Sequence, residues 1–484
     1  MLGLVPVKPL VVEIPWSEAP ESVARGIAPG LGVALLRSGS FDTGERYSLL
    51  AARPFLTFRS FGSRCELRTP DGCRAVFGNP WEVLSRLLAR YELLDEIDFP
   101  FPLGGCFGSW GYDLKNFVEP TVSRRAVNDL ELPDCAVGCY DSLLVFDHQL
   151  HKVWIVSTGL REDGSRSERR AEAAVAWWRG TMRSKAGWGG GRENRGTALR
   201  VTSNFTRGGF EGAVRRALGC IQQGDIYQVN LAQRLRVDGK VDAAALYDAL
   251  LAVSPAPFSA YFDFGDWQLV SSSPELFLRI NGSGIRTRPI KGTRPRSRDP
   301  ERDAQLTYEL QTSAKEMAEL VMITDLLRND LGRVSEYGSV QVPDLVRLEK
   351  YPQVQHLVST VEGRLRAGLT HLDALAKCFP GGSITGAPKV RAMQIIDELE
   401  PVTRGPYTGA HGYLGFNRES MLSISIRTAT VQPDVTTFHV GAGIVADSVP
   451  EMEYDETLAK ARGFLQALEV AGVSAAAPVQ AVRR

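Results

Sequence analysis

The stretch AKEMAELVMITDLLRNDLGRV, residues 314–334, has the apolar period of an amphipathic helix. Apolar side chains from Glu301 onward fall on roughly one stripe, so we expect residues 301–331 to be largely helical. The stripe consists of Leu306, Leu310, Met317, Leu320, Val321 and Leu327. Glu316 and Glu319 stand three residues apart in this stretch, so both carboxylates project from one face of the helix.

A second carboxylate pair, Glu453 and Glu456 in EYDETLAK, has the same spacing, and we expect residues 451–470 to form the last helix. Like charges on one helix face repel each other, so the simpler interpretation is two solvated helix faces. The other interpretation is that the two pairs converge on a hard cation, because Mg²⁺ prefers oxygen ligands. The spacing alone leaves both interpretations open.

Other segments predict a mixture of strands and helices. Residues 421–431 alternate in polarity, which predicts one strand with apolar side chains on one face and Arg427 on the other. Further expected elements are strands at 143–146 and 153–156, a helix near 168–179 and a helix that begins at Pro388. Because strands and helices do not alternate regularly, we expect an α+β fold rather than a doubly wound sheet.

A Gly-rich, charged stretch, KAGWGGGRENR at 185–195, interrupts these patterns and is typical of a linker. It predicts an N-terminal domain over 1–184, a linker or mobile loop over 185–197, a second domain over 198–470 and a tail over 471–484.

The composition argues against several classes of protein. Lys+Arg and Asp+Glu each number 56 in the 484 residues, and a net charge of zero argues against a non-specific nucleic-acid-binding protein. No apolar run approaches the roughly 20 residues that span a bilayer, so we expect no membrane partner. Seven sparse cysteines and an N-terminus without a signal-peptide pattern predict a reduced, cytoplasmic protein.

Three short segments are candidates for binding or chemistry. SITGAP (383–388) and VGAGIVADS (440–448) offer backbone amides to a ligand, although either segment is also typical of a plain turn. Lys291 lies in TRPIKGTRPR among arginines whose charges favour the neutral, nucleophilic amine. The alternative is an ordinary surface lysine in a basic loop.

One further pattern, GGCFG at 104–108, matches the G-x-C-x-G of a glutamine amidotransferase nucleophile. A reactive thiol there also needs a histidine and an acid. The next histidines, His148 and His151, lack the His-x-Glu arrangement, so we expect Cys106 to be structural.

Taken together, the second half of the chain resembles the chorismate-utilising enzymes. The matching stretches, in order, are GDIYQVNLAQR (224–234), SSSPELF (271–277), RPIKGTRPR (288–296), residues 314–334, VQHLVSTVEG (354–363), FPGGSITGAPK (379–389), SIRTA (425–429) and GAGIVADSVPEMEYDET (441–457). The first half matches more loosely, through RYSLLAARP (46–54) and PLGGCFGSWGYDL (102–114). The resemblance implies a two-domain α+β fold with a β-sandwich-like core of two sheets flanked by helices, and makes 198–470 the chorismate-binding domain.

The resemblance also implies a set of site residues. Glu319 and Glu456 look like direct ligands of Mg²⁺, with Glu316 and Glu453 acting through water, and the metal should hold the ring carboxylate of chorismate. The groups similar to those that bind the substrate's carboxylates are Thr385, Tyr407, Arg427, Lys460 and the amides around Gly441 and Gly443.

Within this family the chain most resembles component I of aminodeoxychorismate synthase. Anthranilate synthases usually have Ala where this chain has Lys291, whose amine is expected to add to ring carbon 2 and expel the 4-hydroxyl. Glu275 resembles the general acid/base for that hydroxyl, and His356 matches a histidine near the substrate. Isochorismate and salicylate synthases have a lysine in place of Gln228, so the resemblance favours an enzyme that uses ammonia.

The implied reaction converts chorismate and ammonia to 4-amino-4-deoxychorismate in 4-aminobenzoate and folate biosynthesis. We expect a separate glutamine amidotransferase subunit as the partner that supplies ammonia. The alternatives are component I of an anthranilate synthase and a non-catalytic chorismate or tryptophan sensor. Some N-domains of the family bind tryptophan, and the positions that resemble that pocket are Ser38, Arg46, Tyr47, Pro257, Phe258 and Ser259.

Overall fold

The computed structural model describes residues 8–16, 18–38, 46–94, 99–183, 198–351 and 353–476. The expected linker at 185–197 and residues 477–484 of the expected tail lie outside this part of the chain. Within it, two large sheets of 13 and 12 strands form the framework. Their strands pair antiparallel, except that β11 and β25 are parallel.

The strands of the first sheet are, in spatial order, β1 (Leu10–Ile14), β10 (Lys152–Ser157), β9 (Ser142–Asp147), β3 (Tyr47–Ala51), β2 (Ala34–Arg37), β13 (Phe258–Asp263), β14 (Gln268–Ser273), β23 (Thr428–Gln432), β24 (Val435–Ile444), β12 (Gln228–Asp238), β11 (Ala198–Ser203) and β25 (Ser474–Ala476), with β20 (Gly386–Ala387) beside β12. Those of the second sheet are β17 (Ile290–Pro295), β19 (Val354–Arg364), β16 (Gly284–Arg288), β15 (Leu276–Asn281), β22 (Glu419–Ile424), β21 (Ala410–Gly415), β7 (Gly105–Trp110), β8 (Cys135–Tyr140), β4 (Leu56–Phe61), β5 (Arg64–Thr69) and β6 (Gly72–Phe77), with β18 (Gln341–Lys350) beside β19.

The main hydrophobic core lies between the two sheets. Leu36 and Leu49 of the first sheet and Phe58, Phe107 and Leu422 of the second belong to one buried cluster. Alternating strand residues of each sheet face this cluster, as expected for sheets that pack face to face. The predicted α+β fold, with a β-sandwich-like core flanked by helices, is therefore confirmed.

Each sheet combines strands from both halves of the sequence. In the first sheet β2 pairs with β13, and in the second β7 pairs with β21. The division into domains at 185–197 therefore does not separate one sheet from the other, and it stays a prediction.

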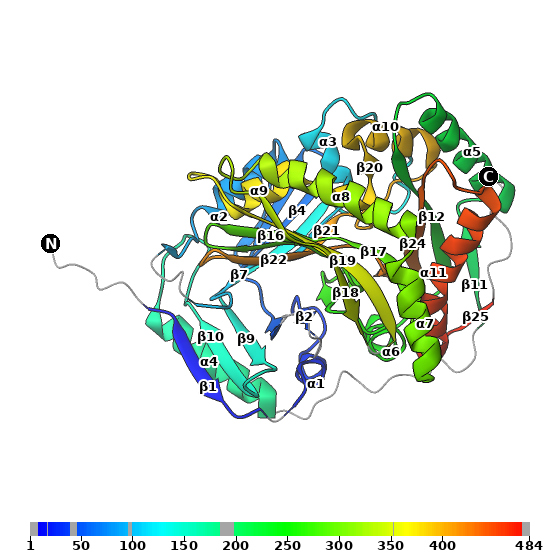
Figure 1. Cartoon of the computed structure of the whole chain (residues 1–484). Coiled ribbons are helices and arrows are strands. Elements are labelled where there is room, and N and C mark those ends of the chain that lie inside the picture. The colour runs from blue at the N-terminus through cyan, green and yellow to red at the C-terminus, as the bar shows by residue number, and fades with distance from the viewer. Residues whose placement is uncertain are drawn as a thin grey trace.

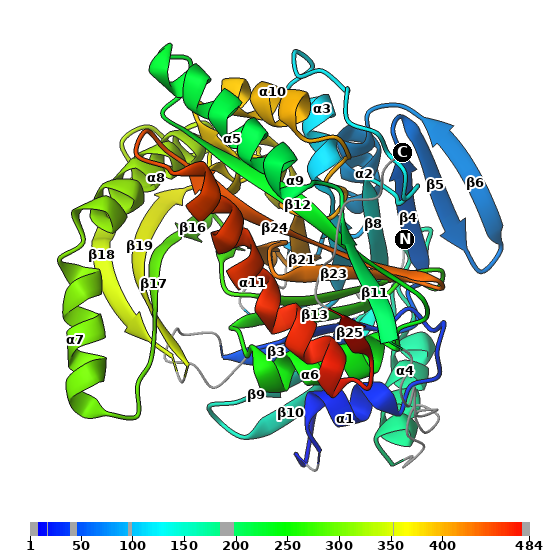
Figure 2. The ribbon, with the colours of Figure 1, turned by 90° about the vertical axis from the view of Figure 1, so that its right-hand side faces the viewer.

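Helices cover the outer faces of the sheets. Their bounds are α1 (Pro20–Arg25), α2 (Pro80–Leu88), α3 (Lys115–Val118), α4 (Glu168–Arg183), α5 (Arg207–Gln222), α6 (Ala243–Val253), α7 (Pro300–Gln311), α8 (Ala314–Gly332), α9 (His371–Cys378), α10 (Lys389–Leu399) and α11 (Pro450–Val470). Helix α8 lies across strands of the second sheet (Figure 1). On the first sheet, α5 lies over β12 and β24, α11 over β24, and α6 over β13 and β14 (Figure 2). None of the described helices is long and apolar enough to cross a membrane.

The helices predicted for the second half are present with small differences. The segment 301–331 is two helices, because Ser313 caps the N-terminus of α8 with its hydroxyl 3.3 Å from the amide of Glu316. Pro388 is the N-cap of α10, and α11 extends from Pro450 to Val470.

The prediction of one strand over 421–431 is wrong. The chain leaves the second sheet at the end of β22 and enters the first at the start of β23. Between them Arg427 has a φ of +48°, which no regular strand contains. Arg427 is therefore presented by a bend between two sheets, and an alternating pattern cannot reveal such a bend.

Candidate active site

A cavity of about 450 Å³ lies where the chain crosses from one sheet to the other. Glu275 occupies the crossing between β14 and β15, and Arg427 occupies the crossing between β22 and β23. Strands β17 and β24 contribute further wall residues, and the first turns of α8 and α11 contribute carboxylates. The cavity is therefore bounded by both sheets, by the two segments that connect them and by the first turns of two helices.

All but two of the residues predicted for catalysis, substrate binding and metal binding line this cavity. They are Glu275, Lys291, Glu316, Glu319, His356, Tyr407, Arg427, Gly441, Gly443, Glu453, Glu456 and Lys460. The two that do not line it are Gln228 and Thr385. Both lie directly behind the wall and are buried.

Lys291 reaches the cavity from a bulged strand. The register of β17 on β19 shifts between Lys291 and Thr293, and Gly292 between them has a φ of +66°. A Cβ at Gly292 would lie 2.8 Å from Leu310 Cδ1 and 3.2 Å from Glu316 Oε2. A glycine here therefore lets the bulged strand pass close to α8 and its first carboxylate.

The arginines around Lys291 are each engaged by a carboxylate. Arg296 Nε donates to Asp303 Oδ1 at 2.8 Å, Arg294 lies 3.2 Å from Glu316, and Arg288 pairs with Glu349. The arginine charges beside Lys291 are therefore each compensated by a carboxylate, and their influence on the lysine amine stays a prediction. Lys291 itself forms no ion pair with a described residue.

Glu275 is buried at the inner part of the cavity. Burial raises the pKa of this carboxyl to about 7, while a hydrogen bond with Ser383 and the charge of Lys291 lower it. A carboxyl with a pKa near neutrality can both donate and accept a proton at physiological pH.

The four glutamates of α8 and α11 form an acidic group on the outer part of the wall. Burial raises the pKa of Glu319, and the charges of Glu316 and Glu456 raise it further. Burial likewise raises the pKa of Glu453, whose Oε1 accepts a hydrogen bond of 2.6 Å from Ser448. These shifts require that the carboxylates of the two helices lie near one another.

The donor chemistry of this acidic group fits a hard cation, because carboxylate oxygens are the ligands that Mg²⁺ prefers. In the part of the chain that the structure describes, however, no three His, Cys, Asp or Glu side chains form a ready coordination group. Glu456 instead lies 2.7 Å from Lys460, and Glu316 lies 3.2 Å from Arg294.

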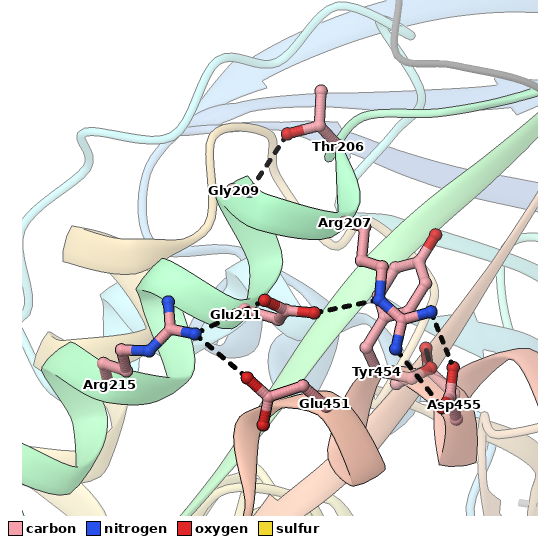
Figure 3. Close-up of polar contacts among 9 residues, drawn as sticks. Thr206, Arg207, Gly209, Glu211, Arg215, Glu451, Tyr454 and Asp455 are labelled. Carbon is pink, nitrogen blue, oxygen red and sulfur yellow. Dashed lines mark hydrogen bonds and ion pairs between the residues drawn. The ribbon is translucent and has the colours of Figure 1, made fainter.

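Helix α5 holds the first turns of α11 from the outside (Figure 3). Arg215 of α5 lies 3.2 Å from Glu451, and Arg207 lies 3.3 Å from Asp455 with its guanidinium over the ring of Tyr454. Exposed pairs of this kind contribute little stability singly. They lie on the turns of α11 that also carry Glu453 and Glu456, so α5 contacts the segment that presents those carboxylates.

The inner end of the cavity is built around a buried ion pair. Arg404 donates to both carboxylate oxygens of Glu400, at 2.9 and 2.6 Å, and to the carbonyl of Asn230 at 2.7 Å. Its guanidinium also lies near the ring of Tyr407, which stacks on His439 with centroids 4.8 Å apart. Burial raises the pKa of the Tyr407 hydroxyl to about 12.

Arg427, like Lys291, lines the cavity without a partner carboxylate among the described residues. Burial lowers the pKa of its guanidinium from the usual value. A mostly buried guanidinium without an anion is costly, and a bidentate carboxylate ligand would compensate it.

Glycines of β24 allow side chains to approach this strand. A Cβ at Gly441 would lie 2.9 Å from the hydroxyl of Tyr407, and one at Gly443 would lie 2.6 Å from Nε2 of Gln228. Lys460 Nζ donates to the Gly441 carbonyl at 2.9 Å. Thr385 uses its hydroxyl on the Gly381 carbonyl at 3.0 Å, so its side chain supports the loop behind the wall.

Lys389, the last residue of FPGGSITGAPK, stabilises the loop that contains Ser383 and Thr385. Its Nζ donates to both oxygens of Asp330 at 2.6 Å and to the Cys378 carbonyl at 3.0 Å. This buried pair ties α10 to α8 beneath the Ser383 segment.

His356 lies on β19 and is buried, with its Nδ1 2.8 Å from the hydroxyl of Thr293. Burial and then the charge of Arg427 lower the pKa of His356 to about 4, so this ring is neutral at physiological pH.

Further wall residues were not among the predicted site residues. The polar ones include Asn230, Lys315 and His439, and also Ser383 from the SITGAP segment. Lys315 directly precedes Glu316 and lowers the pKa of both Glu319 and Glu453. Its signal in the sequence is a cation next to a carboxylate pair, whereas His439 has no local pattern that marks it.

Five of the six residues predicted for a tryptophan pocket line a separate void of about 10 Å³, and these are Ser38, Tyr47, Pro257, Phe258 and Ser259. Arg46 does not line it, because its guanidinium is engaged by Asp147 at 2.5 Å. A void of this size holds about one water molecule. Tryptophan binding stays a prediction.

Cys106 lies on β7 and is fully buried, and burial raises the pKa of its thiol well above the usual value. A buried, protonated thiol is inert. The expected structural role of this cysteine agrees with its position.

Comparison with known proteins identifies the family. The model of the chorismate binding enzymes matches residues 44–466. The chain is 43% identical to the anthranilate synthase component 1 of Thermus thermophilus, over 85% of this chain and 88% of that protein. It is 39% identical to the aminodeoxychorismate synthase component 1 of Klebsiella aerogenes, over 95% and 99%.

Solved structures agree in fold. The anthranilate synthase component I of Streptococcus pneumoniae superposes with a TM-score of 0.76 at 29% identity, covering 90% of this chain and 94% of that one. The menaquinone-specific isochorismate synthase of Escherichia coli superposes with a TM-score of 0.72 at 20% identity, covering 95% and 94%. On the match to the family model and on these relatives, the chain belongs to the chorismate binding enzymes.

Proposed function

We propose that this protein converts chorismate and ammonia to 4-amino-4-deoxychorismate. The observation that carries the proposal is the presence of Lys291 and Glu275 on the wall of one cavity, close enough for the lysine to lower the pKa of the carboxyl. A lysine at this position distinguishes the aminodeoxychorismate synthases that the chain resembles from anthranilate synthases. Overall identity does not distinguish them, since relatives of both names match at 39%.

Chorismate is a dicarboxylate, and the cavity offers separate places for its two anionic groups. Arg427 at the inner wall would form a bidentate pair with one carboxylate. The ring carboxylate would face the acidic group, where Mg²⁺ held by Glu319 and Glu456, with Glu316 and Glu453 acting through water, would neutralise its charge. Lys460 would assist there, since its Nζ lies between Glu456 and the Gly441 carbonyl.

Lys291 would then act as the nucleophile. Its neutral amine forms a bond to ring carbon 2, the ring double bond shifts, and the bond from carbon 4 to its hydroxyl oxygen breaks. Glu275 donates the proton with which that hydroxyl leaves as water. Its pKa of about 7 leaves a substantial protonated fraction at neutral pH.

Ammonia completes the exchange. It adds at carbon 4, the double bond returns, and Lys291 leaves carbon 2 as a free amine. The proton that the added nitrogen loses returns to Glu275, so chorismate and ammonia yield the amino product and water with both side chains regenerated. His356 would remain neutral throughout and serve as a hydrogen-bonding wall group.

The rival function is anthranilate formation, which the 43% identity to the Thermus thermophilus enzyme favours. A non-catalytic chorismate or tryptophan sensor is the third alternative, which the presence of Glu275, Lys291 and both glutamate pairs in the cavity disfavours. Incubation with chorismate, Mg²⁺ and ammonium chloride, followed by mass analysis, separates the three. The amino adduct supports the proposal, whereas anthranilate with pyruvate, or no turnover, contradicts it.

Lys291→Ala sharpens this test. The variant should lose formation of the amino product while keeping Mg²⁺ binding and the unfolding transition of the parent. Lys377→Ala, which removes an exposed lysine of α9, is the matched control. Full activity of Lys291→Ala would refute the role of the lysine as nucleophile.

We also propose an amidotransferase subunit as partner, because the relatives are named as first components. Ammonium salts should support some turnover without it. Co-purification with a glutaminase that makes the reaction depend on glutamine would support the partnership, and an unchanged rate with glutamine would contradict it.

A further inference from the structure

Arg404 lies directly behind the inner wall of the candidate active site. Its side chain is 1% exposed, and it is not among the residues that line the cavity. A guanidinium carries five N–H groups in a fixed planar fork, and each of the five has an acceptor here. The acceptors are both carboxylate oxygens of Glu400, the carbonyls of Asn230 and Ile384, and the hydroxyl of Thr408. Every donor of this buried cation is therefore used within the protein.

The acceptors belong to four separate segments of the chain. Glu400 follows the last residue of α10, Asn230 lies on β12, Ile384 belongs to the SITGAP segment, and Thr408 follows Tyr407. The Nη2 atom of the guanidinium donates to the Asn230 carbonyl at 2.7 Å, and Nη1 donates to Ile384 at 3.2 Å and to Thr408 at 3.1 Å. Because Asn230, Ile384 and Tyr407 line the cavity, one guanidinium connects three parts of its inner wall.

Glu400 determines how the fork is oriented. Its Oε1 and Oε2 accept from Arg404 at 2.6 and 2.9 Å, and Oε1 also accepts from the amide of Ala232 on β12 at 2.9 Å. A bidentate pair fixes the orientation of a guanidinium as well as its position. The directions of the other three N–H groups are therefore set by α10 and β12.

Tyr407 is held through the residue that follows it. Thr408 Oγ1 accepts from Arg404 and donates to the Tyr407 carbonyl at 2.6 Å. The φ of Thr408 is +59°, a conformation that is costly for a β-branched residue and is kept only by surrounding contacts. The guanidinium also lies 5.6 Å from the ring centroid of Tyr407. Arg404 thus contacts both the ring of this tyrosine and the residue that fixes its backbone.

The hydroxyl end of Tyr407 lies beside Asn230. A Cβ at Gly441 would lie 2.9 Å from both the Tyr407 hydroxyl and Asn230 Oδ1, so the two polar atoms share the space over this glycine. Asn230 is itself fixed, because its Nδ2 donates to the Ile384 carbonyl at 3.1 Å and its own carbonyl accepts from Arg404. Arg404 therefore acts on both ends of the tyrosine side chain.

Stability alone does not account for this arrangement. A buried ion pair can be replaced by apolar side chains of similar volume with little loss of stability. An apolar side chain, however, has no donors with which to join four segments at set distances. The planar fork of an arginine does this, because its N–H groups point in fixed directions.

We propose that Arg404 is a positioning residue for chorismate, which holds Tyr407 in the orientation in which the phenol hydroxyl meets a carboxylate of the substrate. The inference rests on the proposed function for the identity of the substrate. It adds a residue that acts on substrate binding from behind the wall and does not touch the substrate itself.

A double-mutant cycle on chorismate binding tests this role. Arg404→Lys keeps the charge beside Glu400 but lacks the planar fork, so the Kd for chorismate should rise at least tenfold. Tyr407→Phe should raise the Kd to a similar extent. In the double variant, Arg404→Lys should add no more than twofold to the effect of Tyr407→Phe, because the hydroxyl that it positions is already absent. Calorimetry with Mg²⁺ and without ammonia measures each Kd.

Two further variants separate positioning from folding. Thr408→Val removes one acceptor of Arg404 and keeps the ion pair with Glu400, so it should unfold at the same temperature as the parent and raise the Kd about threefold. Thr408→Ser, which restores the hydroxyl, should recover the Kd of the parent. Arg391→Lys, at a partly exposed ion pair of α10, is the matched control and should leave the Kd within twofold.

An unchanged Kd in a folded Arg404→Lys variant would overturn the proposal. A tenfold further rise in the double variant would also overturn it, since the arginine would then act independently of Tyr407. If Arg404→Lys does not fold, Thr408→Val decides: an unchanged Kd overturns the proposal, and a raised Kd that Thr408→Ser restores supports it. Formation of anthranilate by the wild-type enzyme refutes the proposed function instead, and the cycle still decides the role of Arg404 because it measures binding without amination.

Discussion

Glu275 and Lys291 line one cavity, and burial raises the pKa of the carboxyl to about 7 although the ammonium of Lys291 lowers it. The lysine charge is thus too weak to offset the burial of Glu275 inside the crossing between the sheets. This balance makes the carboxyl a proton donor at neutral pH, and it also makes an ionised Glu275 unfavourable for folding.

Glu275→Gln should therefore stabilise the protein at high pH. The raised pKa means that the stability of the parent falls as pH rises from about 4.5 to about 7, and is constant above that. Glutamine does not titrate, so the free energy of unfolding of the variant should exceed that of the parent increasingly over the same pH window. The difference should reach about 3 kcal/mol. Urea unfolding at pH 4.5 and pH 8 measures it, and an equal gain at both would contradict the assignment.

The same variant should lose catalysis. Glutamine retains the size of Glu275 but cannot release a proton, so kcat for amination should fall about 100-fold or more while KM for chorismate changes little. In the parent, the activity should fall as pH rises above about 7, because the donor form is lost. A parent profile that is flat between pH 6 and 9 would argue against Glu275 as the acid.

Arg427→Met should weaken chorismate binding and stabilise the folded chain. The guanidinium is largely buried and has no carboxylate partner among the described residues, so its removal relieves a desolvation cost that a bound anion would compensate. We expect the Kd for chorismate, measured by calorimetry, to rise about 100-fold, in line with the loss of a bidentate charged pair. Arg328→Met, at an exposed i,i+3 pair of α8, is the control and should leave binding unchanged.

Glu319→Gln and Glu456→Gln should each lower the affinity for Mg²⁺ at least tenfold. Each change removes one carboxylate charge from the acidic group of α8 and α11. Glu469→Gln, at the exposed far end of α11, should not change it. Calorimetry with Mg²⁺ and no substrate measures this directly, and unchanged affinity in both variants would place the metal elsewhere.

Lys389→Met should destabilise the protein by about 3–5 kcal/mol, because it leaves Asp330 buried and unpaired. The double variant Lys389→Met, Asp330→Leu should recover part of that loss, since the charge left behind is also removed. Guanidinium unfolding of the three proteins measures both effects. A single variant as stable as the parent would show that the pair does not hold α10 to α8.

The sequence alone predicts the helices whose apolar residues recur with a single helical period. The helices that carry the four glutamates are present, because their apolar stripes are local, as are the Ser313 cap of α8 and the first-turn Pro450 of α11. The resemblance then allowed the candidate residues on distant segments to be grouped, and most of them line one cavity.

What the sequence could not predict depends on long-range placement. The strand expected at 421–431 is divided because its two ends pair in different sheets, which alternation cannot show. The arginines near Lys291 are neutralised by Asp303, Glu316 and Glu349, which follow in other elements. His439 has no neighbours in sequence that mark it, and only the folded chain places its ring on the cavity wall.

Because β2 pairs with β13 and β7 with β21, each sheet is completed only by strands from the opposite half of the chain. A chimera that joined one half of this protein to the other half of a relative would have to re-form every one of those borders between unfamiliar edges. Recombination near the middle of the gene should therefore be poorly tolerated. Conversion between aminodeoxychorismate and anthranilate formation among relatives is better attempted by single substitutions near the two chain crossings between the sheets.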